Sequence, residues 1–298
     1  MLRILAFVVF VLLSGCADPK QQRLDAWILA EQASGNMKTD RAPADIPVDA
    51  DLLIQNFERI AFDLEDPFGE RKDSDLPPPE RILRKWTSDI RYKVYGKNIG
   101  ASLSYPHIER FMDRLSGLTG VSVQNLRRLD PPERDELKPN LLILAGNAVE
   151  FNDQARRLPQ KVARLKEGEG RGTRIMADFM KVWHPSGSPC ALEIFTGNTE
   201  KKNPGEIAFA LVYMRTDVVS ILRDSCVEEE LAQAMGLMND HPDVRPSIFN
   251  DDQEFALLTE HDELLLRILY DDRLRAGMSP EEAMPVVRKV AHELRPGS

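Results

Sequence analysis

The sequence is short of positive charge and of the motifs that mark nucleotide enzymes. Lysine and arginine number 39 against 48 aspartate and glutamate residues, which gives a formal net charge of −9. A nucleic-acid surface needs a basic patch, so this balance argues against a nucleic-acid partner. The sequence contains no P-loop, no dinucleotide-binding fingerprint and no nucleophile elbow. Nucleotide-dependent chemistry and serine- or cysteine-based hydrolysis therefore have no support.

The first residues are apolar, but over too short a length to cross a bilayer. Arg3 gives a positive start, and residues 4–13 form an almost unbroken apolar run. That length is typical of the hydrophobic region of a signal peptide. Residues 13–16 read Leu-Ser-Gly-Cys and match the bacterial lipobox, in which the cysteine receives a diacylglycerol and becomes the new N-terminus. The alternative is a plain secretory signal in which Cys16 is incidental.

The lipobox predicts the compartment of the mature protein. We predict that residues 1–16 are a lipoprotein signal peptide and that the lipid bilayer is a partner through acylated Cys16. The next residue is Ala17 and not aspartate. By the sorting rule of enterobacteria, this predicts an anchor on the periplasmic side of the outer membrane.

Cysteine is scarce, and two cysteines remain after Cys16 is set aside. Cys190 and Cys226 would lie in an oxidising periplasm, where a pair of thiols predicts a disulfide. The bond would tie the edge of a strand to the start of the central helix. A loop of about 35 residues would contribute about 3–4 kcal/mol in the chain-entropy model. The alternative is two separate buried thiols.

Length and composition allow one large domain, or a domain with an arm. With 298 residues and 42% hydrophobic residues, the chain can bury a sizeable core. We predict an N-terminal arm with helices and a linker at 17–79 and a main domain at 80–298. The fold class is α+β, a small mixed sheet with packed helices. Alternation predicts a strand at 86–95, a continuous apolar run predicts a buried strand at 141–145, and strand-like runs lie at 121–123, 191–195 and 207–213. The sequence predicts helices at 24–32, 51–62, 104–118, 147–165, 175–180 and 280–294.

The segment 226–251 organises the rest of the chain. Apolar residues recur there at helical spacing and predict one apolar stripe. Gly236 is a natural helix stop, because glycine adopts the left-handed conformation at little cost. The simpler alternative is an amphipathic helix whose acidic face lies in water. The stripe consists of Val227, Leu231, Ala234 and Met238.

This segment resembles the motif of the metzincin zinc peptidases with its ligands replaced. That motif is H-E-x-x-H-x-x-G-x-x-H, followed by a turn that contains methionine. Glu229, Gln233 and Asn239 stand at the positions of the three histidines. Glu230 stands at the position of the catalytic glutamate, and Gly236 matches the glycine.

Two later stretches extend the resemblance. Residues 247–249 read Ser-Ile-Phe and resemble the Ser-Ile-Met of the methionine turn, with Phe249 as a hydrophobic floor. Residues 258–270 resemble the closing helix of such domains, and Trp86 precedes the first strand as in many of them. The whole pattern is also similar to an uncharacterised family of predicted lipoproteins from proteobacteria, a domain of unknown function, over most of the mature chain. The resemblance implies a metzincin-like fold.

The replaced ligands predict a site without metal. Glutamine and asparagine amides are poor zinc ligands, and one carboxylate with two amides would not hold zinc tightly. Without a metal, Glu230 has no activated water to deprotonate. His241 is the one histidine beside the site, and a lone histidine next to a turn is more often a surface residue. We therefore predict no metal, no cofactor and no catalysis.

Three functions stay open. The first is a membrane-anchored periplasmic protein whose peptidase-like but inactive cleft binds an unknown periplasmic peptide, protein or envelope polymer. The second is an active metal-dependent peptidase or other hydrolase with atypical ligands. The third is a purely structural envelope lipoprotein. The predicted cleft residues are Glu229, Glu230, Gln233, Asn239, Asp240 and Phe249.

Overall fold

The computed structural model describes residues 19–62, 81–96, 104–132, 137–162, 188–197 and 204–297. The predicted signal peptide with Cys16, the predicted linker at 63–79 and the predicted helix at 175–180 lie outside these residues.

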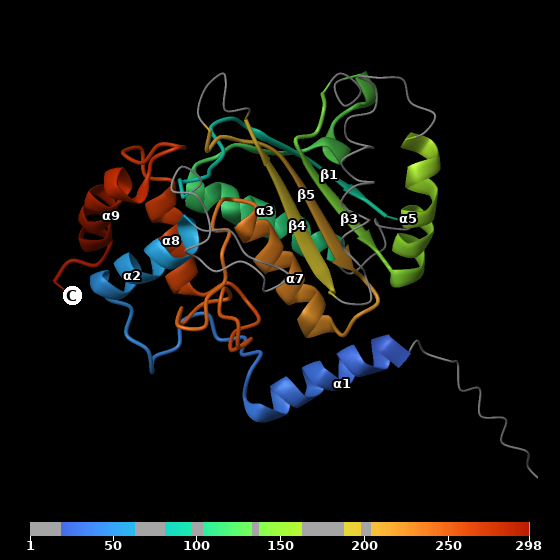
Figure 1. Ribbon diagram of the computed structural model, residues 1–298, viewed down its shortest axis with the longest axis horizontal. Helices are drawn as coiled ribbons and strands as arrows, with labels where there is room; N and C mark the ends of the chain where they lie inside the picture. The colour runs from blue at the N-terminus through green and yellow to red at the C-terminus, as the bar shows by residue number, and fades with distance from the viewer. Residues whose placement is uncertain are drawn as a thin grey trace, which may run out of the picture.

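A five-stranded mixed sheet forms the centre of the protein (Figure 1). The strands follow the order β2-β1-β3-β5-β4. β4 runs antiparallel to β5, while the other three pairs are parallel. This confirms the α+β class and the mixed sheet. The strands are β1 Ile90–Tyr95, β2 Val123–Asn125, β3 Leu141–Gly146, β4 Cys190–Thr196 and β5 Ile207–Arg215.

Some helices pack on the sheet, and a further group of helices lies to one side of it. α3 and α7 pack against each other, and α7 also contacts β4 and β5. α2, α8 and α9 gather at one side of the molecule, away from α5 (Figure 1). The helices are α1 Pro19–Ser34, α2 Ala50–Ala61, α3 Ser104–Thr119, the 3₁₀ turn η4 Leu126–Arg128, α5 Ala148–Val162, α7 Ser220–Gln233, α8 Glu260–Leu269 and α9 Pro280–Leu294.

Local capping explains where the helices begin. The side chain of Asp49 accepts a hydrogen bond from the N–H of Leu52, one of the free donors at the start of α2. Glu282 accepts from the N–H of Ser279 (3.1 Å) ahead of α9, whose first residue is proline. These starts match the sequence-based predictions, because the capping residues lie within one turn of the donors that they satisfy.

The predicted strand at 86–95 is shorter than its alternation indicates. β1 begins at Ile90, because Trp86 does not pair as part of that strand. Its indole Nε1 donates to the carbonyl of Ala234 (2.8 Å), and its side chain is 2% exposed. Trp86 therefore packs on the end of α7, and tertiary contact outweighs its strand propensity.

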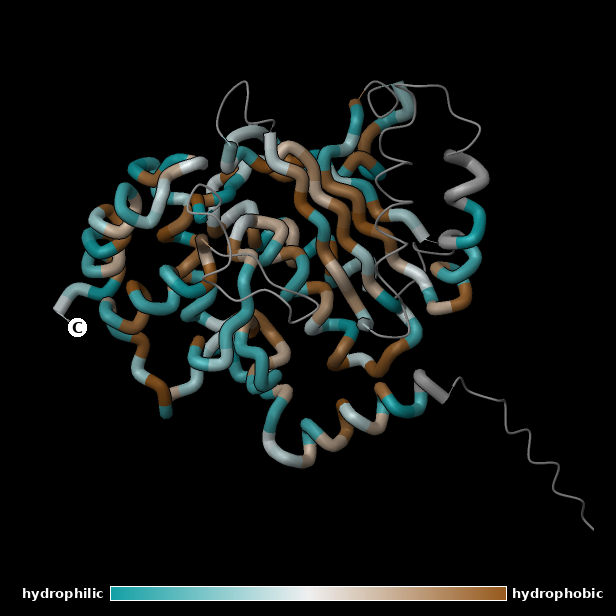
Figure 2. Tube along the Cα trace, viewed as in Figure 1, coloured by the Kyte–Doolittle hydropathy of each residue, from teal (hydrophilic) through white to brown (hydrophobic). Residues whose placement is uncertain are grey.

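Although residues 17–79 are predicted as an arm, α2 shares one core with α8 and α9. Its buried face includes Leu53, Phe57 and Ile60, each 0% exposed. An apolar helical face must be covered, and α9 and α8 cover it. Figure 2 shows hydrophobic residues along the strands and on the helices that face them. Among the described helices, none is both long enough and apolar enough to cross a membrane.

Candidate functional site

The central helix ends in a turn that requires glycine. α7 ends at Gln233, three residues before the predicted stop, and tighter hydrogen bonds carry the chain on to Gly236. Gly236 has a φ of +117°, and a Cβ there would lie 1.9 Å from the carbonyl oxygen of Arg84. The glycine therefore serves both the left-handed turn and the close approach of the segment before β1.

Most of the predicted cleft residues are enclosed by protein. Glu230, Gln233 and Asn239 are 7%, 3% and 5% exposed, while Glu229 and Asp240 are half-buried. The alternative of an amphipathic helix with its acidic face in water is therefore wrong for this part of α7. It fails because α3, the sheet and the loops after α7 surround the helix.

The two amides at the histidine positions are used inside the protein. Gln233 Nε2 donates to Asp240 Oδ1 (3.1 Å). Asn239 Nδ2 donates to the carbonyl of Arg59 (2.9 Å), and its N–H donates to the carbonyl of Ile60 (3.2 Å). Carbonyls in the last turn of a helix have no partner within that helix. Asn239 therefore caps the end of α2, a role that local sequence does not indicate.

The described residues contain no group of three or more His, Cys, Asp or Glu side chains placed to hold a metal ion. His241 is half-buried, and its Nδ1 accepts from the N–H of Asp243 (3.1 Å). It supports the turn after Asn239.

The Ser247-Ile248-Phe249 turn is fixed to the start of α8 by one buried carboxylate. Asp262 Oδ1 accepts from Ser247 Oγ (2.5 Å), and Asp262 Oδ2 accepts from the N–H of Ile248 (3.0 Å). Asp262 also forms a capping box with Thr259 at the start of α8. Phe249 is 0% exposed, and its carbonyl accepts from the N–H of His241 (3.0 Å). The turn and the segment after α7 are thus one connected unit.

Glu228 is the most highly connected acid of α7, and its role does not appear in the sequence. Its carboxylate accepts from both Nη atoms of Arg41 (2.7 and 2.6 Å), from His107 Nε2 (2.9 Å) and from the N–H of Leu258 (2.9 Å). His107 Nδ1 lies 3.1 Å from Asp224 Oδ1. The glutamate side chain is 1% exposed. It holds together the N-terminal segment, α3, α7 and the approach to α8.

The pKa values agree with a charged cluster. Burial opposes ionisation of Glu228, but hydrogen bonds from His107 and Arg41 outweigh it and lower its pKa to about 2. Burial also acts to lower the pKa of His107, but hydrogen bonds with Glu228 and Asp224 outweigh that effect and raise the pKa. Both shifts favour a protonated imidazole that donates from its two nitrogens.

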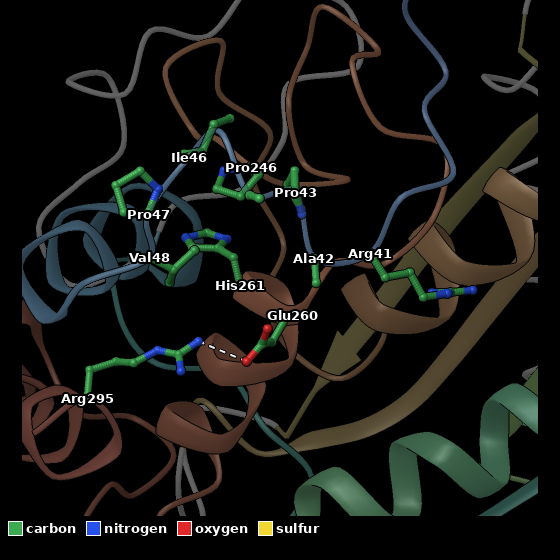
Figure 3. A pocket seen from close by; sticks show the side chains of 11 residues that line it. Arg41, Ala42, Pro43, Ile46, Pro47, Val48, Pro246, Glu260, His261 and Arg295 are labelled. Atoms are coloured by element: carbon green, nitrogen blue, oxygen red, sulfur yellow. Dashed lines mark hydrogen bonds and ion pairs between the residues drawn. The ribbon is translucent and has the colours of Figure 1, made fainter.

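A cavity of about 290 Å³ lies where the N-terminal segment crosses the start of α8 (Figure 3). Glu260 forms an ion pair with Arg295 at this place (2.9 Å), and His261 forms part of the wall. The predicted cleft residues do not line the cavity. Its other lining residues are Arg41, Ala42, Pro43, Ala44, Ile46, Pro47, Val48 and Pro246.

A comparison with protein families finds a match over most of the chain. Residues 50–289 match the family described as protein of unknown function (DUF2927). The chain belongs to this family. No curated protein and no solved structure matches the sequence.

Membership agrees with the resemblance to an uncharacterised family. In this DUF2927 chain the match begins at the first residue of α2 and includes α7, the 247–249 turn and α8. α1 and Arg41 precede the match, so Arg41 ties a segment outside the matched region to Glu228 inside it.

The disulfide is the clearest sequence-based prediction in this region. Cys190 of β4 and Cys226 of α7 are bonded, with their Cα atoms 5.7 Å apart. The alternative of two separate thiols is wrong. The bond joins the edge strand to the helix that carries Glu228 and Gln233.

Proposed function

We propose that this DUF2927 protein is a lipid-anchored envelope protein on the periplasmic side, with a metzincin-like scaffold that binds a peptide and does not hydrolyse it. The observation that carries the proposal is the use of Gln233 and Asn239 as internal hydrogen-bond donors. The anchor rests on the lipobox that ends at Cys16.

Three features support the metzincin-like scaffold. The helix in the position of the zinc-binding helix ends in a turn that only Gly236 fits. The Ser247-Ile248-Phe249 turn follows it, buried and bonded to the segment after the helix. Trp86 stands ahead of the first strand and packs on the end of the helix.

The donor chemistry supports a non-catalytic role. Zinc sites in proteins are built from histidine, cysteine and carboxylate. Here the second and third positions hold amides, and the Asn239 amide is bonded to a backbone carbonyl of α2. Glu230 would need a metal-bound water to act as a general base. The competing active hydrolase with atypical ligands has no comparable support in the described residues.

We expect the mature chain purified in zinc-containing buffer to hold less than stoichiometric zinc and to leave a peptide library uncleaved. Elemental analysis and mass spectrometry of the library measure this, with Glu230→Gln as the control. Stoichiometric zinc together with peptide cleavage, both lost in Glu230→Gln, would show that the protein is an enzyme.

A variant that restores the motif tests the scaffold separately. Glu229→His, Gln233→His and Asn239→His together are expected to take up about one zinc ion per chain, since three histidines suffice for a catalytic-type site. Circular dichroism shows whether this variant is folded. A folded triple variant that takes up no zinc would contradict the metzincin-like arrangement and leave the lack of catalysis unaffected.

The cavity beside α8 is the place that we propose for peptide binding. Its volume of about 290 Å³ suits one or two side chains, because pockets for drug-sized ligands are about 300–1,000 Å³. Alanine, proline, isoleucine and valine supply seven of its eleven lining residues. The Glu260–Arg295 ion pair places one negative and one positive group at one side of the cavity (Figure 3). This chemistry fits an apolar side chain whose peptide backbone makes polar contacts.

We expect short peptides that bind the mature chain to bind Ala44→Trp at least about tenfold more weakly, because each 1.4 kcal/mol of lost contact is tenfold. Ala44 is an exposed lining residue, so the larger side chain fills the cavity without entering the core. Fluorescence polarisation with a fixed peptide set measures the affinities. Val149→Trp is the matched control, since Val149 is 74% exposed on α5. Equal binding by both variants, or binding of no peptide, would contradict the proposed site.

A further inference from the structure

α1 exposes apolar side chains to solvent. Trp27 is 42% exposed and Leu29 is 59% exposed, two of the largest exposed apolar residues in the described chain. Ile28 is 0% exposed and seats the helix on the rest of the protein. Figures 1 and 2 show α1 at the edge of the molecule, apart from the sheet, with hydrophobic residues along it.

The exposed side of α1 carries no acidic residue. In a helix, residues three and four positions apart share one face. Arg23, Trp27 and Ala30 form one exposed row of α1, and Ala26, Leu29 and Ala33 form the row beside it. Gln32 is also exposed, whereas Asp25 and Glu31 are half-buried. In a chain with a net charge of −9, this face is unusually free of negative charge.

The position of α1 in the chain limits what it can face. Pro19, its first residue, follows Cys16 by three residues. An extended chain spans at most about 3.3–3.6 Å per residue, so α1 begins within about 11 Å of the cysteine. If Cys16 carries the lipid, the start of α1 therefore lies at the headgroup layer, which is about 5–8 Å thick on each side of the hydrocarbon core.

We propose that the exposed face of α1 lies flat on the bilayer that holds acylated Cys16. This rests on the lipid anchor of the proposed function. Tryptophan prefers the membrane interface, and arginine buries its aliphatic stem there while its charge stays in water. Trp27 and Arg23 are one turn apart on the exposed face, so both reach the interface when the helix axis is parallel to it.

Hydrogen bonds made by the residues after α1 fix the orientation of this helix relative to the rest of the protein. The N–H of Asn36 donates to the carbonyl of Glu31 (2.9 Å), and the N–H of Met37 donates to the carbonyl of Gln253 (2.9 Å). Arg41 then binds Glu228. A helix held on the bilayer thus fixes which side of the domain faces the membrane.

The test uses the full, lipidated protein in vesicles of phosphatidylethanolamine and phosphatidylglycerol with brominated acyl chains. We expect the brominated lipid to quench the emission of Trp27 by about half, since an interfacial helix buries its apolar face about 5–10 Å into the headgroup boundary. The quenching is the difference between the wild type and Trp27→Phe, which removes the signal of the other tryptophans. Val149→Trp in the Trp27→Phe background is the matched control, and we expect it to stay unquenched.

Flotation of the same vesicles separates the two proposals. Wild type that floats without quenching of Trp27 would overturn the contact of α1 and leave the anchor intact. Equal quenching at Val149→Trp would also overturn it, because the whole surface would then adsorb. If mass spectrometry shows no lipid on Cys16 and the wild type floats no better than Cys16→Ser, the anchor fails and the proposed contact fails with it.

Discussion

Replacement of Glu228 by glutamine is expected to destabilise the folded protein by about 3 kcal/mol, the lower end of the cost of breaking a buried ion pair, because the side chain of Arg41 is 35% exposed. The carboxylate accepts from Arg41, from His107 and from a backbone N–H, and it is 1% exposed. Glutamine keeps the size but presents an NH₂ group to donors, so Arg41 loses its counter-charge and His107 keeps only that of Asp224. Urea unfolding followed by circular dichroism gives the free energy of unfolding.

A surface pair provides the matched control. Asp153 and Arg157 form an i,i+4 ion pair on α5, with side chains 45% and 68% exposed. Asp153→Asn is expected to cost at most about 0.5 kcal/mol, because water screens such pairs. A loss below about 1 kcal/mol for Glu228→Gln would show that the cluster does not hold the N-terminal segment to α7.

The pH dependence identifies the charge as the cause. The pKa of Glu228 falls from its ordinary value of 4.5 to about 2, so its ionised form stabilises the folded state above pH 4.5 and this contribution is lost as the pH falls toward 2. The pKa of His107 is raised above 6.5, so its contribution is complete below 6.5 and is lost as the pH rises through the folded value. The difference in stability between the wild type and Glu228→Gln is therefore expected to shrink below pH 4.5. A difference that stays constant from pH 6 to pH 3 would contradict this.

Loss of the disulfide is expected to cost about 3–4 kcal/mol, because the bond closes a long loop and restricts the unfolded chain. Cys190 and Cys226 are 36 residues apart in the sequence, and the loop between them contains β5. Reduction of the disulfide should therefore lower the midpoint of urea unfolding. The contacts of β4 with β5 should stay in place in the folded, reduced protein. Urea unfolding with and without reductant measures the change.

The double variant Cys190→Ala and Cys226→Ala serves as the control for the reductant. We expect it to be destabilised already and to show no further change when reductant is added. A wild-type midpoint that reductant leaves unchanged, with free thiols confirmed by mass spectrometry, would contradict the loop-closure account.

The elements that the sequence predicts well are those with local causes. Asp49 accepts from the N–H of Leu52 and Glu282 accepts from the N–H of Ser279, each within one turn, so α2 and α9 begin where their sequences indicate. The two strand-like runs that form β4 and β5 pair as an antiparallel hairpin, as the turn residues between them indicate. β1 is shorter than predicted, because the indole of Trp86 bonds to Ala234, which is distant in the sequence.

The candidate site likewise contains one feature that the sequence predicts and others that it does not. The sequence predicts Gly236 at a turn, and its φ of +117° agrees, because one residue without a Cβ decides that local conformation. The sequence does not predict that Asn239 caps α2 or that Glu228 binds Arg41, which is 187 residues away. No local pattern marks a contact whose two partners become neighbours only when the chain is folded.

By itself the sequence determined the α+β class, the cysteine pair and the turn at Gly236, since residue periodicity, the small number of cysteines and backbone sterics can be read without knowledge of distant contacts. Only the tertiary structure decided that Glu230 and Gln233 are buried, that Glu228 joins four segments and that the cavity lies beside α8. Burial and ion pairing depend on which surfaces meet, and that is set by the packing of α2, α3, α7 and α8 together.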